Sequence, residues 1–456
     1  MNSIGVKLMH KNNELPIVAV VGRPNVGKSS LVNRVLGGRF AVVEDRPGVT
    51  RDRVIYPAQW AGHNFLLMDT GGWDSKSEGL GEIVTKSAEI GIGLADVVLF
   101  VVDATCPVTA TDEALLKIIR KFQKPTILVA NKADNTQIEF EASGLWNLGL
   151  GTPFAVSALH GRSFGDLLDE VVKATQTLSS SKNTDQEHDE TTRRVALVGR
   201  PNVGKSSLLN KLSGTSRSIV SPVAGTTRDP VDEIVQLENS TWKFVDTAGI
   251  RKKGKTSSGA DFYALLRTRV AIEKSELVLC VMDASEPICE QDIRIANYAI
   301  EAGKALILVL NKWDMLSQHN DLTGRREMLE REVEQDLTFL DWAPRVNLSA
   351  KTGWHRDRLE QAMRTALKSW DARISTGELN AFLGRLVSEH PHPLRGGKQP
   401  RILFGTQASS RPPKFVIFAT GFLEHQYRRF IERRIREEYG FEGSPLEISV
   451  RIRNSK

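Results

Sequence analysis

The sequence predicts an α/β chain, in which two doubly wound parallel-sheet domains stand in tandem and a smaller α+β domain follows them. Its 456 residues, 40% of them hydrophobic and 25% charged, are too many for one core of ordinary size. The decapeptide GRPNVGKSSL occurs twice, at residues 22–31 and 199–208. Behind each copy, short apolar runs alternate with longer stretches of helical period, which is typical of alternating strands and helices.

Other motifs recur at the same spacing as the decapeptide, 177 residues apart. TRD at 50–52 returns at 227–229, and DTGG at 69–72 returns as DTAG at 246–249. NKAD at 131 and NKWD at 311 keep the order with a spacing of 180. Such a period is far too long for a solenoid repeat, so it indicates duplication of a whole domain.

Domain boundaries follow from the repeat and from composition. Between the copies lies the polar, acidic segment LSSSKNTDQEHDETT, which has no apolar periodicity and is typical of a flexible linker. The expected divisions are an N-terminal extension (1–15), a first α/β domain (16–177), the linker (178–192), a second α/β domain (193–370) and a third domain (371–456).

The apolar runs of each copy are continuous rather than alternating. Examples are residues 16–21 (PIVAVV), 97–102 (VVLFVV) and 126–131 (TILVAN). Continuous runs suit parallel strands that helices cover on both faces. Nucleotides bind at the carboxyl ends of such strands, which is where the repeated motifs fall.

The repeated decapeptide contains GxxxxGKS, directly after a strand pattern and before a helical one, which is the context of a phosphate-binding P-loop. Its backbone N–H groups surround phosphate oxygens, Lys28 and Lys205 bridge the β- and γ-phosphates, and Ser29 and Ser206 offer hydroxyls to Mg²⁺. The predicted loop residues are Gly22, Arg23, Pro24, Asn25, Val26, Gly27, Lys28 and Ser29, and Gly199, Arg200, Pro201, Asn202, Val203, Gly204, Lys205 and Ser206.

The DTGG and DTAG motifs lie 47 residues after the start of each P-loop, a shared spacing that a chance turn would not keep. Asp69 and Asp246 are expected near Mg²⁺, and Gly72 and Gly249 near the γ-phosphate. Their neighbours in the predicted site are Thr70, Gly71 and Trp73, and Thr247, Ala248 and Ile250. Thr50 and Thr227 are candidates to close over Mg²⁺ and the γ-phosphate. The candidate catalytic residues are Lys28, Thr50, Gly72, Lys205, Thr227 and Gly249.

Base choice is assigned to the NKxD motifs. Asp134 and Asp314 can each accept hydrogen bonds from the N1–H and the exocyclic amine of guanine, a donor pair that adenine lacks, so GTP is preferred to ATP. The motif residues are Asn131, Lys132, Ala133 and Asp134, and Asn311, Lys312, Trp313 and Asp314. The SAL and SAK loops are expected to present backbone N–H groups to the guanine oxygen, through Ser157 and Ala158, and Ser349 and Ala350.

The formal net charge of +6 belongs to the third domain. Residues 371–456 contain fifteen Lys plus Arg and nine Asp plus Glu, whereas the remaining 385 residues hold 46 of each. The pattern predicts a helix (375–388), two strands (400–407, 414–419), a helix (422–438) and a strand (445–453), an order that resembles a KH-like RNA-binding fold.

In the long helix of this domain, Tyr427, Ile431 and Ile435 should face the core, and Arg429, Arg433 and Arg436 the opposite side. The only GxxG candidate for clamping an RNA backbone, residues 440–443, lies between the last helix and the last strand rather than between two helices. We therefore expect the domain to present a composite surface together with the GTPase domains rather than to bind RNA alone.

With these motifs, and with ISTGELN (374–380) and YGFEGSP (439–445) in the third domain, residues 16–456 resemble the Der (EngA) family of bacterial double-domain GTPases. The resemblance implies two Ras-like P-loop G domains and a KH-like domain, GTP hydrolysis, late maturation of the large (50S) ribosomal subunit and GTP-dependent docking on its ribosomal RNA. Trp73 and Ile250 stand where many GTPases place a water-orienting glutamine, so hydrolysis should be slow or assisted. Asn25 and Asn202 resemble the asparagine by which related GTPases hold K⁺.

Other classes fit less well. The three cysteines, Cys106, Cys280 and Cys289, are too few for a disulfide framework or a zinc site, which favours a reducing cytoplasm. No apolar stretch is long enough for a signal peptide or a bilayer span, so no membrane role is expected, and the chain is expected to be a monomer. One alternative is a GTP-dependent switch or scaffold for protein partners without RNA. Another, a tRNA-modifying GTPase, should carry a cysteine near its C-terminus, and none follows Cys289.

Overall fold

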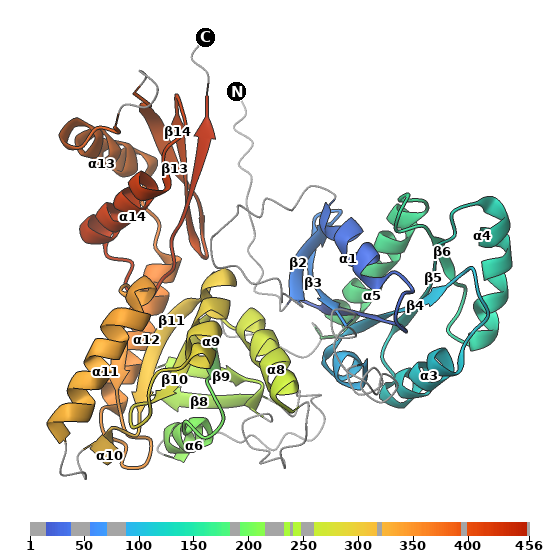
Figure 1. The fold of residues 1–456 in the computed structure, drawn as a ribbon, viewed down its shortest axis with the longest axis horizontal. Helices are drawn as coiled ribbons and strands as arrows, with labels where there is room; N and C mark the ends of the chain where they lie inside the picture. The colour runs from blue at the N-terminus through green and yellow to red at the C-terminus, as the bar shows by residue number, and fades with distance from the viewer. Residues whose placement is uncertain are drawn as a thin grey trace. The chain divides into compact units, whose positions relative to one another are not determined.

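The computed structural model separates the chain into two compact units, residues 1–187 and 188–456, which are described one at a time (Figure 1). The residues that it describes are 15–37, 55–70, 88–182, 192–214, 232–237, 240–247, 260–316, 322–393 and 399–453.

The first unit holds one α/β domain. Its strands are β1 (Ile17–Val21), β2 (Ile55–Trp60), β3 (His63–Asp69), β4 (Val97–Asp103), β5 (Thr126–Asn131) and β6 (Phe154–Val156). Its helices are α1 (Lys28–Gly37), α3 (Ala110–Phe122), α4 (Thr136–Ala142), the 3₁₀ helix η1 (Ser143–Leu148) and α5 (Phe164–Lys182). The helix α5 continues five residues into the segment expected to be linker from residue 178.

The strands form one sheet in the order β2-β3-β1-β4-β5-β6, in which only β2 is antiparallel to its neighbour. Both β1 and β4 are buried along their whole length, as continuous apolar runs predict for covered strands. One face of the sheet packs on α1 and α5, through Leu31, Leu167 and Val171. The carboxyl ends of β1, β3 and β5 consequently deliver the P-loop, Asp69 and Asn131 to one edge.

The second α/β domain repeats this arrangement. Its strands are β7 (Arg193–Val198), β8 (Glu233–Leu237), β9 (Ser240–Val245), β10 (Leu277–Asp283), β11 (Ala305–Asn311) and β12 (Arg345–Asn347). Its helices are α6 (Lys205–Gly214), α8 (Ala260–Lys274), α9 (Glu290–Glu301), α10 (Trp313–Leu316), α11 (Leu322–Asp336), η2 (Thr338–Leu340) and α12 (Arg356–Asp371). The strand order β8-β9-β7-β10-β11-β12 corresponds strand for strand to that of the first sheet, which confirms the duplicated fold.

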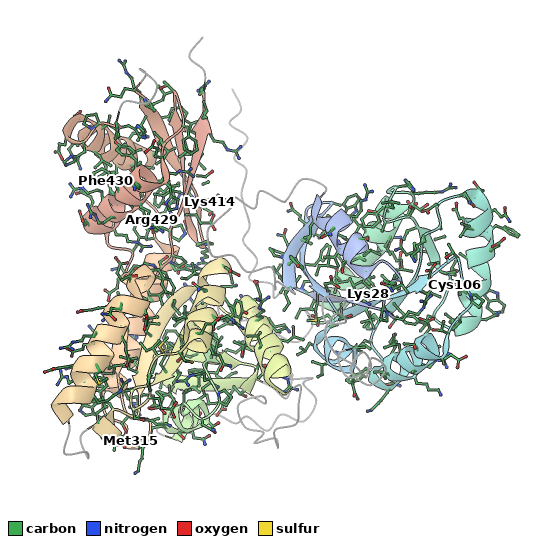
Figure 2. The ribbon with its side chains drawn as sticks, viewed as in Figure 1. Lys28, Cys106, Met315, Lys414, Arg429 and Phe430 are labelled. Carbon is green, nitrogen blue, oxygen red and sulfur yellow. The ribbon has the colours of Figure 1, made fainter. Side chains whose placement is uncertain are left out.

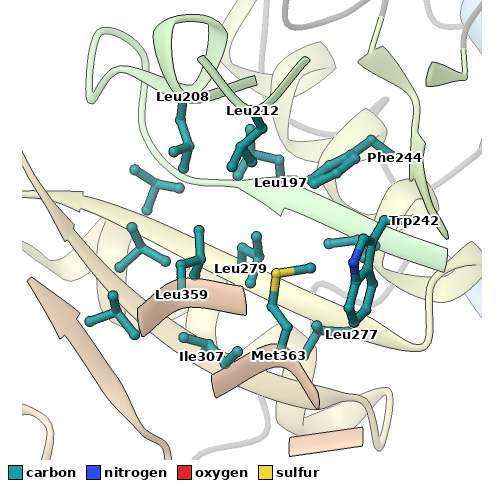
Figure 3. Packing of buried hydrophobic residues seen from close by; sticks show 14 of the residues in the cluster. Leu197, Leu208, Leu212, Trp242, Phe244, Leu277, Leu279, Ile307, Leu359 and Met363 are labelled. Carbon is teal, nitrogen blue, oxygen red and sulfur yellow. The ribbon is translucent and has the colours of Figure 1, made fainter. Parts of the chain in front are cut away.

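The core on one face of the second sheet lies between the strands and two helices (Figure 3). Leu208 and Leu212 of α6 and Leu359 and Met363 of α12 meet the strand residues here, and Trp242 closes one side. The other face packs on α8, α9 and α11. Helices on both faces of a parallel sheet are the expected doubly wound arrangement.

The third domain has the predicted α-β-β-α-β order. It consists of α13 (Thr376–Glu389), β13 (Ile402–Ser410), β14 (Pro413–Ala419), α14 (His425–Tyr439) and β15 (Glu447–Ile452). The strand β14 is antiparallel to β13 and parallel to β15. Tyr427, Ile431 and Ile435 of α14 are buried against the sheet, as predicted from their spacing.

The GxxG candidate lies against the second α/β domain. The Gly443 N–H donates to the Trp342 carbonyl, and the Leu306 N–H of β11 donates to the Gly443 carbonyl, both at 2.8 Å. These two bonds engage the last glycine of the motif in domain packing. Residues 440–443 are therefore not presented as a free clamp for an RNA backbone.

Side chains complete this contact. The Trp370 indole N–H donates to the Gly303 carbonyl at 2.8 Å, and Asp371 forms ion pairs with Arg193 of β7 and, at 2.6 Å, with Arg411 of the third domain. Arg436 differs from the prediction, because it donates to the carbonyls of Phe441 and Ser444 and lies over the Trp342 ring instead of projecting into solvent.

Among the helices that the structure describes, none combines the length and the apolar character needed to cross a bilayer.

Candidate nucleotide-binding sites

The two P-loops have the same backbone shape. Asn25 and Asn202 adopt left-handed conformations, with φ of 64° and 63°, and expose their side chains. Asparagine tolerates this region better than most residues. Gly27 is also left-handed, and a Cβ there would lie 2.3 Å from the Asn131 side-chain nitrogen. The glycine of the motif is thus required by the asparagine of NKxD, which passes directly beneath it.

That asparagine joins the two ends of the site. The buried Asn131 amide donates to the Val26 carbonyl in the P-loop at 2.8 Å and accepts the Ala158 N–H of the SAL loop at 3.0 Å. In the second domain, Asn311 makes the same pair of bonds, to Val203 at 2.7 Å and from Ala350 at 2.9 Å. The phosphate loop and the base loop are therefore held by one side chain in each domain.

This bond changes one expectation. Ala158 and Ala350 were expected to present their N–H groups to the guanine oxygen, whereas each donates to the asparagine in this structure. A base oxygen at this position would share that proton or use the next amide of the loop, at Leu159 or Lys351.

The P-loop lysines point into their own loops. Lys28, labelled in Figure 2 at the start of α1, donates to the carbonyls of Gly22 at 2.8 Å and Arg23 at 2.9 Å. Lys205 does the same with Gly199 and Arg200. Burial lowers the pKa of Lys205 to about 8, because the ammonium ion loses hydration there. A phosphate oxygen at this position would restore the charged form.

Two of the predicted magnesium ligands meet. The Ser29 hydroxyl donates to the Asp69 carboxylate at 3.0 Å, and Asp69 is nearly buried at the end of β3. A hydroxyl and a single carboxylate, completed by phosphate oxygens, suit Mg²⁺ in nucleotide sites. The residues present therefore fit the ion. Asp246 ends the corresponding region of the second domain, with its N–H donating to Asp232 at 3.0 Å.

The lysines of NKxD are held by buried aspartates. Lys132 and Lys312 are left-handed, with φ of 69° and 62°, and their ammonium groups lie 2.6 Å from Asp103 and 2.5 Å from Asp283. Burial alone would raise the pKa of Asp103, but the bonds from Lys132 and Thr105 outweigh it and lower that pKa to about 2. Both lysine stems are thereby fixed beside the expected base position.

Ser157 orients the aspartate that is expected to read the base. Its hydroxyl donates to Asp134 at 2.6 Å and accepts the His160 N–H at 3.0 Å, and the side chain is 1% exposed. One carboxylate oxygen of Asp134 is thus engaged within the protein, which fixes the plane of the other. In the second domain, Trp313 packs partly buried against the core rather than standing free beside the base.

Sequence reasoning missed the residues that brace the P-loops from the side. Arg23 lies 3.3 Å from the buried Asp112 of α3, and Arg200 lies 2.9 Å from the buried Asp292 of α9. The signal was present, because DATCPVTATD (103–112) and DASEPICEQD (283–292) share their aspartates at the 180-residue spacing. The second of these segments also begins with Asp283, which holds Lys312.

Several predicted site residues lie outside the described ranges, and their assignments stay predictions. They are Thr50, Gly71, Gly72, Trp73, Thr227, Ala248, Gly249 and Ile250. Thr70 and Thr247 are described and buried, and the Thr70 hydroxyl donates to the Val20 carbonyl at 2.6 Å.

Both α/β domains and the third domain match known families. Residues 17–132 and 194–312 each match the family described as 50S ribosome-binding GTPase. Residues 373–451 match the family described as KH-domain-like of EngA bacterial GTPase enzymes, C-terminal.

Similar proteins cover nearly the whole chain. It is 58% identical to the GTPase Der of Paenarthrobacter aurescens over 441 residues, which is 97% of this chain and 88% of that protein. It is 56% identical to the GTPase Der of Leifsonia xyli over 442 residues, 97% of this chain and 90% of that one. The GTPase Der of Streptomyces coelicolor is also 56% identical, over 447 residues, with 97% and 94% covered.

Replacing the base-reading aspartate should change which nucleotide binds. In Asp134→Asn or Asp314→Asn, the new amide can donate to the 2-oxo group of xanthine and cannot accept the guanine amine. We expect GDP affinity in the altered domain to fall by about a hundredfold or more and XDP affinity to rise. Competition binding measures both, with Asp166→Asn, on the exposed first turn of α5, as control. Unchanged GDP affinity would contradict the assignment.

Binding to the second domain should take up a proton. Because the pKa of Lys205 is about 8 and phosphate favours its charged form, about half a proton should be taken up at pH 8, little at pH 7 and nearly a whole one at pH 9. Calorimetric GDP titration of the Lys28→Ala chain, in buffers of different ionisation enthalpy, measures this. Uptake that does not change between pH 7 and 9 would show that Lys205 is not the group responsible.

Proposed function

Because the chain belongs to the Der (EngA) family of GTPases, it binds GTP and hydrolyses it to GDP and phosphate, and we propose that it does so in late maturation of the large (50S) ribosomal subunit. The observation that carries this proposal is the match of both G domains to the family described as 50S ribosome-binding GTPase. In this proposal, GTP binding favours docking on the ribosomal RNA of the subunit, and hydrolysis releases the protein. We place this activity in the cytoplasm and in a monomer.

The charge distribution supports an RNA partner. The basic excess of the chain is confined to residues 371–456, which hold fifteen Lys plus Arg against nine Asp plus Glu. Lys414 on β14 and Arg429 on α14 are among these cations (Figure 2). Since residues 440–443 pack on the second G domain, we propose that RNA meets a composite surface of both domains rather than a KH clamp.

The proposed chemistry assigns a role to each part of the site. In the first domain, the P-loop N–H groups and Lys28 bind the phosphates, Ser29 and Asp69 hold Mg²⁺, and Asp134 reads guanine. Ser206, Asp246 and Asp314 have these roles in the second domain, with Lys205. Bound Mg²⁺ neutralises the charge that develops on the transferred phosphoryl group. Thr50 and Thr227 are proposed to close over the γ-phosphate, next to Gly72 and Gly249.

Trp73 and Ile250 cannot orient a water molecule, so we propose that hydrolysis is slow and is assisted by K⁺. The exposed, left-handed Asn25 and Asn202 lie at the tips of the phosphate loops, where a side-chain carbonyl oxygen is available to a monovalent cation. A cation there would supply positive charge to the transition state, as an arginine finger does in other GTPases.

Association with the subunit should depend on the nucleotide. The protein is expected to cosediment with purified 50S subunits in the presence of a non-hydrolysable GTP analogue and to be released with GDP. The small (30S) subunit is the control for non-specific binding to RNA, and the salt dependence measures the phosphate contacts. Binding that is absent, or equal with the two nucleotides, would favour the alternative of a switch for protein partners.

Potassium should stimulate hydrolysis through the two asparagines. We expect phosphate release to be at least about tenfold faster in KCl than in NaCl. Asn25→Gly and Asn202→Gly should each remove the stimulation in one domain, because glycine keeps the left-handed backbone and lacks the side-chain oxygen. Asn33→Ala and Asn210→Ala, exposed on α1 and α6, are matched controls. Equal turnover in both salts rules the idea out.

A further inference from the structure

We propose that Arg34, in the last turn of the P-loop helix α1, is a positioning residue for the base-reading loop, and that Lys211 has this role in the second domain. Neither is part of a nucleotide motif. The inference rests on the proposed base site, because it concerns the loop that contains Ser157 and Ala158.

In the first domain, Arg34 holds two consecutive carbonyls of this loop. Its Nε donates to the Ala158 carbonyl at 2.8 Å, and its terminal nitrogen donates to the Leu159 carbonyl. The residues joined are 124 positions apart in the sequence, so the contact is tertiary rather than a local helix cap. The guanidinium fork suits two neighbouring carbonyl acceptors.

The second domain places a cation at the same point. Lys211 stands 177 residues after Arg34, in the last turn of α6. The corresponding loop glycines, Gly161 and Gly353, are both left-handed, with φ of 77° and 85°. A Cβ on Gly161 would lie 3.3 Å from the Arg34 guanidinium, and one on Gly353 would lie 2.6 Å from Lys211 Cε. In both copies, the loop glycine makes room for the helix cation.

The bonds to Arg34 also fix the amides of the loop. Because a peptide unit is planar and trans, holding the Ala158 carbonyl directs the Leu159 N–H to the opposite side of the loop. The Ala158 N–H is held separately by Asn131. The amides available to a guanine oxygen are thus set from two directions, by Asn131 and by Arg34.

The helix α1 therefore contacts both ends of the nucleotide site. It begins at Lys28 and Ser29, where the phosphates are expected, and its last turn holds the base loop through Arg34. A ten-residue helix is rigid on this scale, so it fixes the separation between the phosphate and base positions. Loss of Arg34 should loosen the base loop without touching the phosphate loop.

The test uses the full chain with Lys205→Ala, so that only the first domain holds nucleotide. Arg34→Ala is expected to speed dissociation of fluorescent GDP by about five- to tenfold, and Arg34→Lys, the residue type of the second domain, by less than about twofold. Arg120→Ala is the matched control, because Arg120 also ends a helix and donates to a backbone carbonyl, that of Leu148 at 2.8 Å, away from the site.

A second readout separates positioning from general loosening. In 6-thio-GDP the base oxygen is replaced by sulfur, a poor acceptor, so the unaltered Arg34 chain should bind it more weakly than GDP. In Arg34→Ala this difference should shrink, because the loop amides no longer meet the base oxygen.

Unchanged GDP dissociation in Arg34→Ala, or an equal loss of affinity for GDP and 6-thio-GDP, would overturn the positioning role and leave the base site intact. Equal binding of the two nucleotides by the Arg34 chain would instead contradict the base-reading role of the loop, and the positioning role with it.

Discussion

The buried asparagine of NKxD is the interaction on which each site depends. Its amide uses a donor for a P-loop carbonyl and its oxygen for an amide of the base loop, in both domains. Side-chain amides with less than 3% exposure are stable only when they are hydrogen-bonded. Here the partners are two loops that would otherwise lack a common support. The end of one strand, β5 or β11, thereby sets the geometry of phosphate and base binding together.

Much of the fold and many site residues could be predicted from the sequence, because they are local. Strand ends, the P-loop and the NKxD motif follow from apolar runs and fixed spacings, and Asp69 does meet Ser29. The missed features depend on tertiary partners. No pattern shows that Ser157 turns its hydroxyl to Asp134, or that Arg436 bends toward Trp342 instead of solvent. The bracing pairs of Arg23 and Arg200 were visible only as a weak second repeat.

The duplication also shows where the two G domains differ. Their sheets have the same strand order, yet the P-loop arginine meets Cys106 and Asp112 in the first domain and Glu286 and Asp292 in the second. Near the base loop, an arginine in one copy corresponds to a lysine in the other. Both differences are in residues that support the loops rather than in the motifs themselves. Such positions can tune two similar sites independently.

The bond between Leu306 and Gly443 has a consequence for the integrity of the chain. The strand β12 covers β11 only from Leu308 to Leu310, and the third domain supplies the partner of Leu306 beyond it. A chain cut before residue 440 would leave part of ALILVLN as an uncovered, uncharged strand edge. Edges of this kind template association with other chains. The third domain therefore protects the second G domain from aggregation, whatever else it binds.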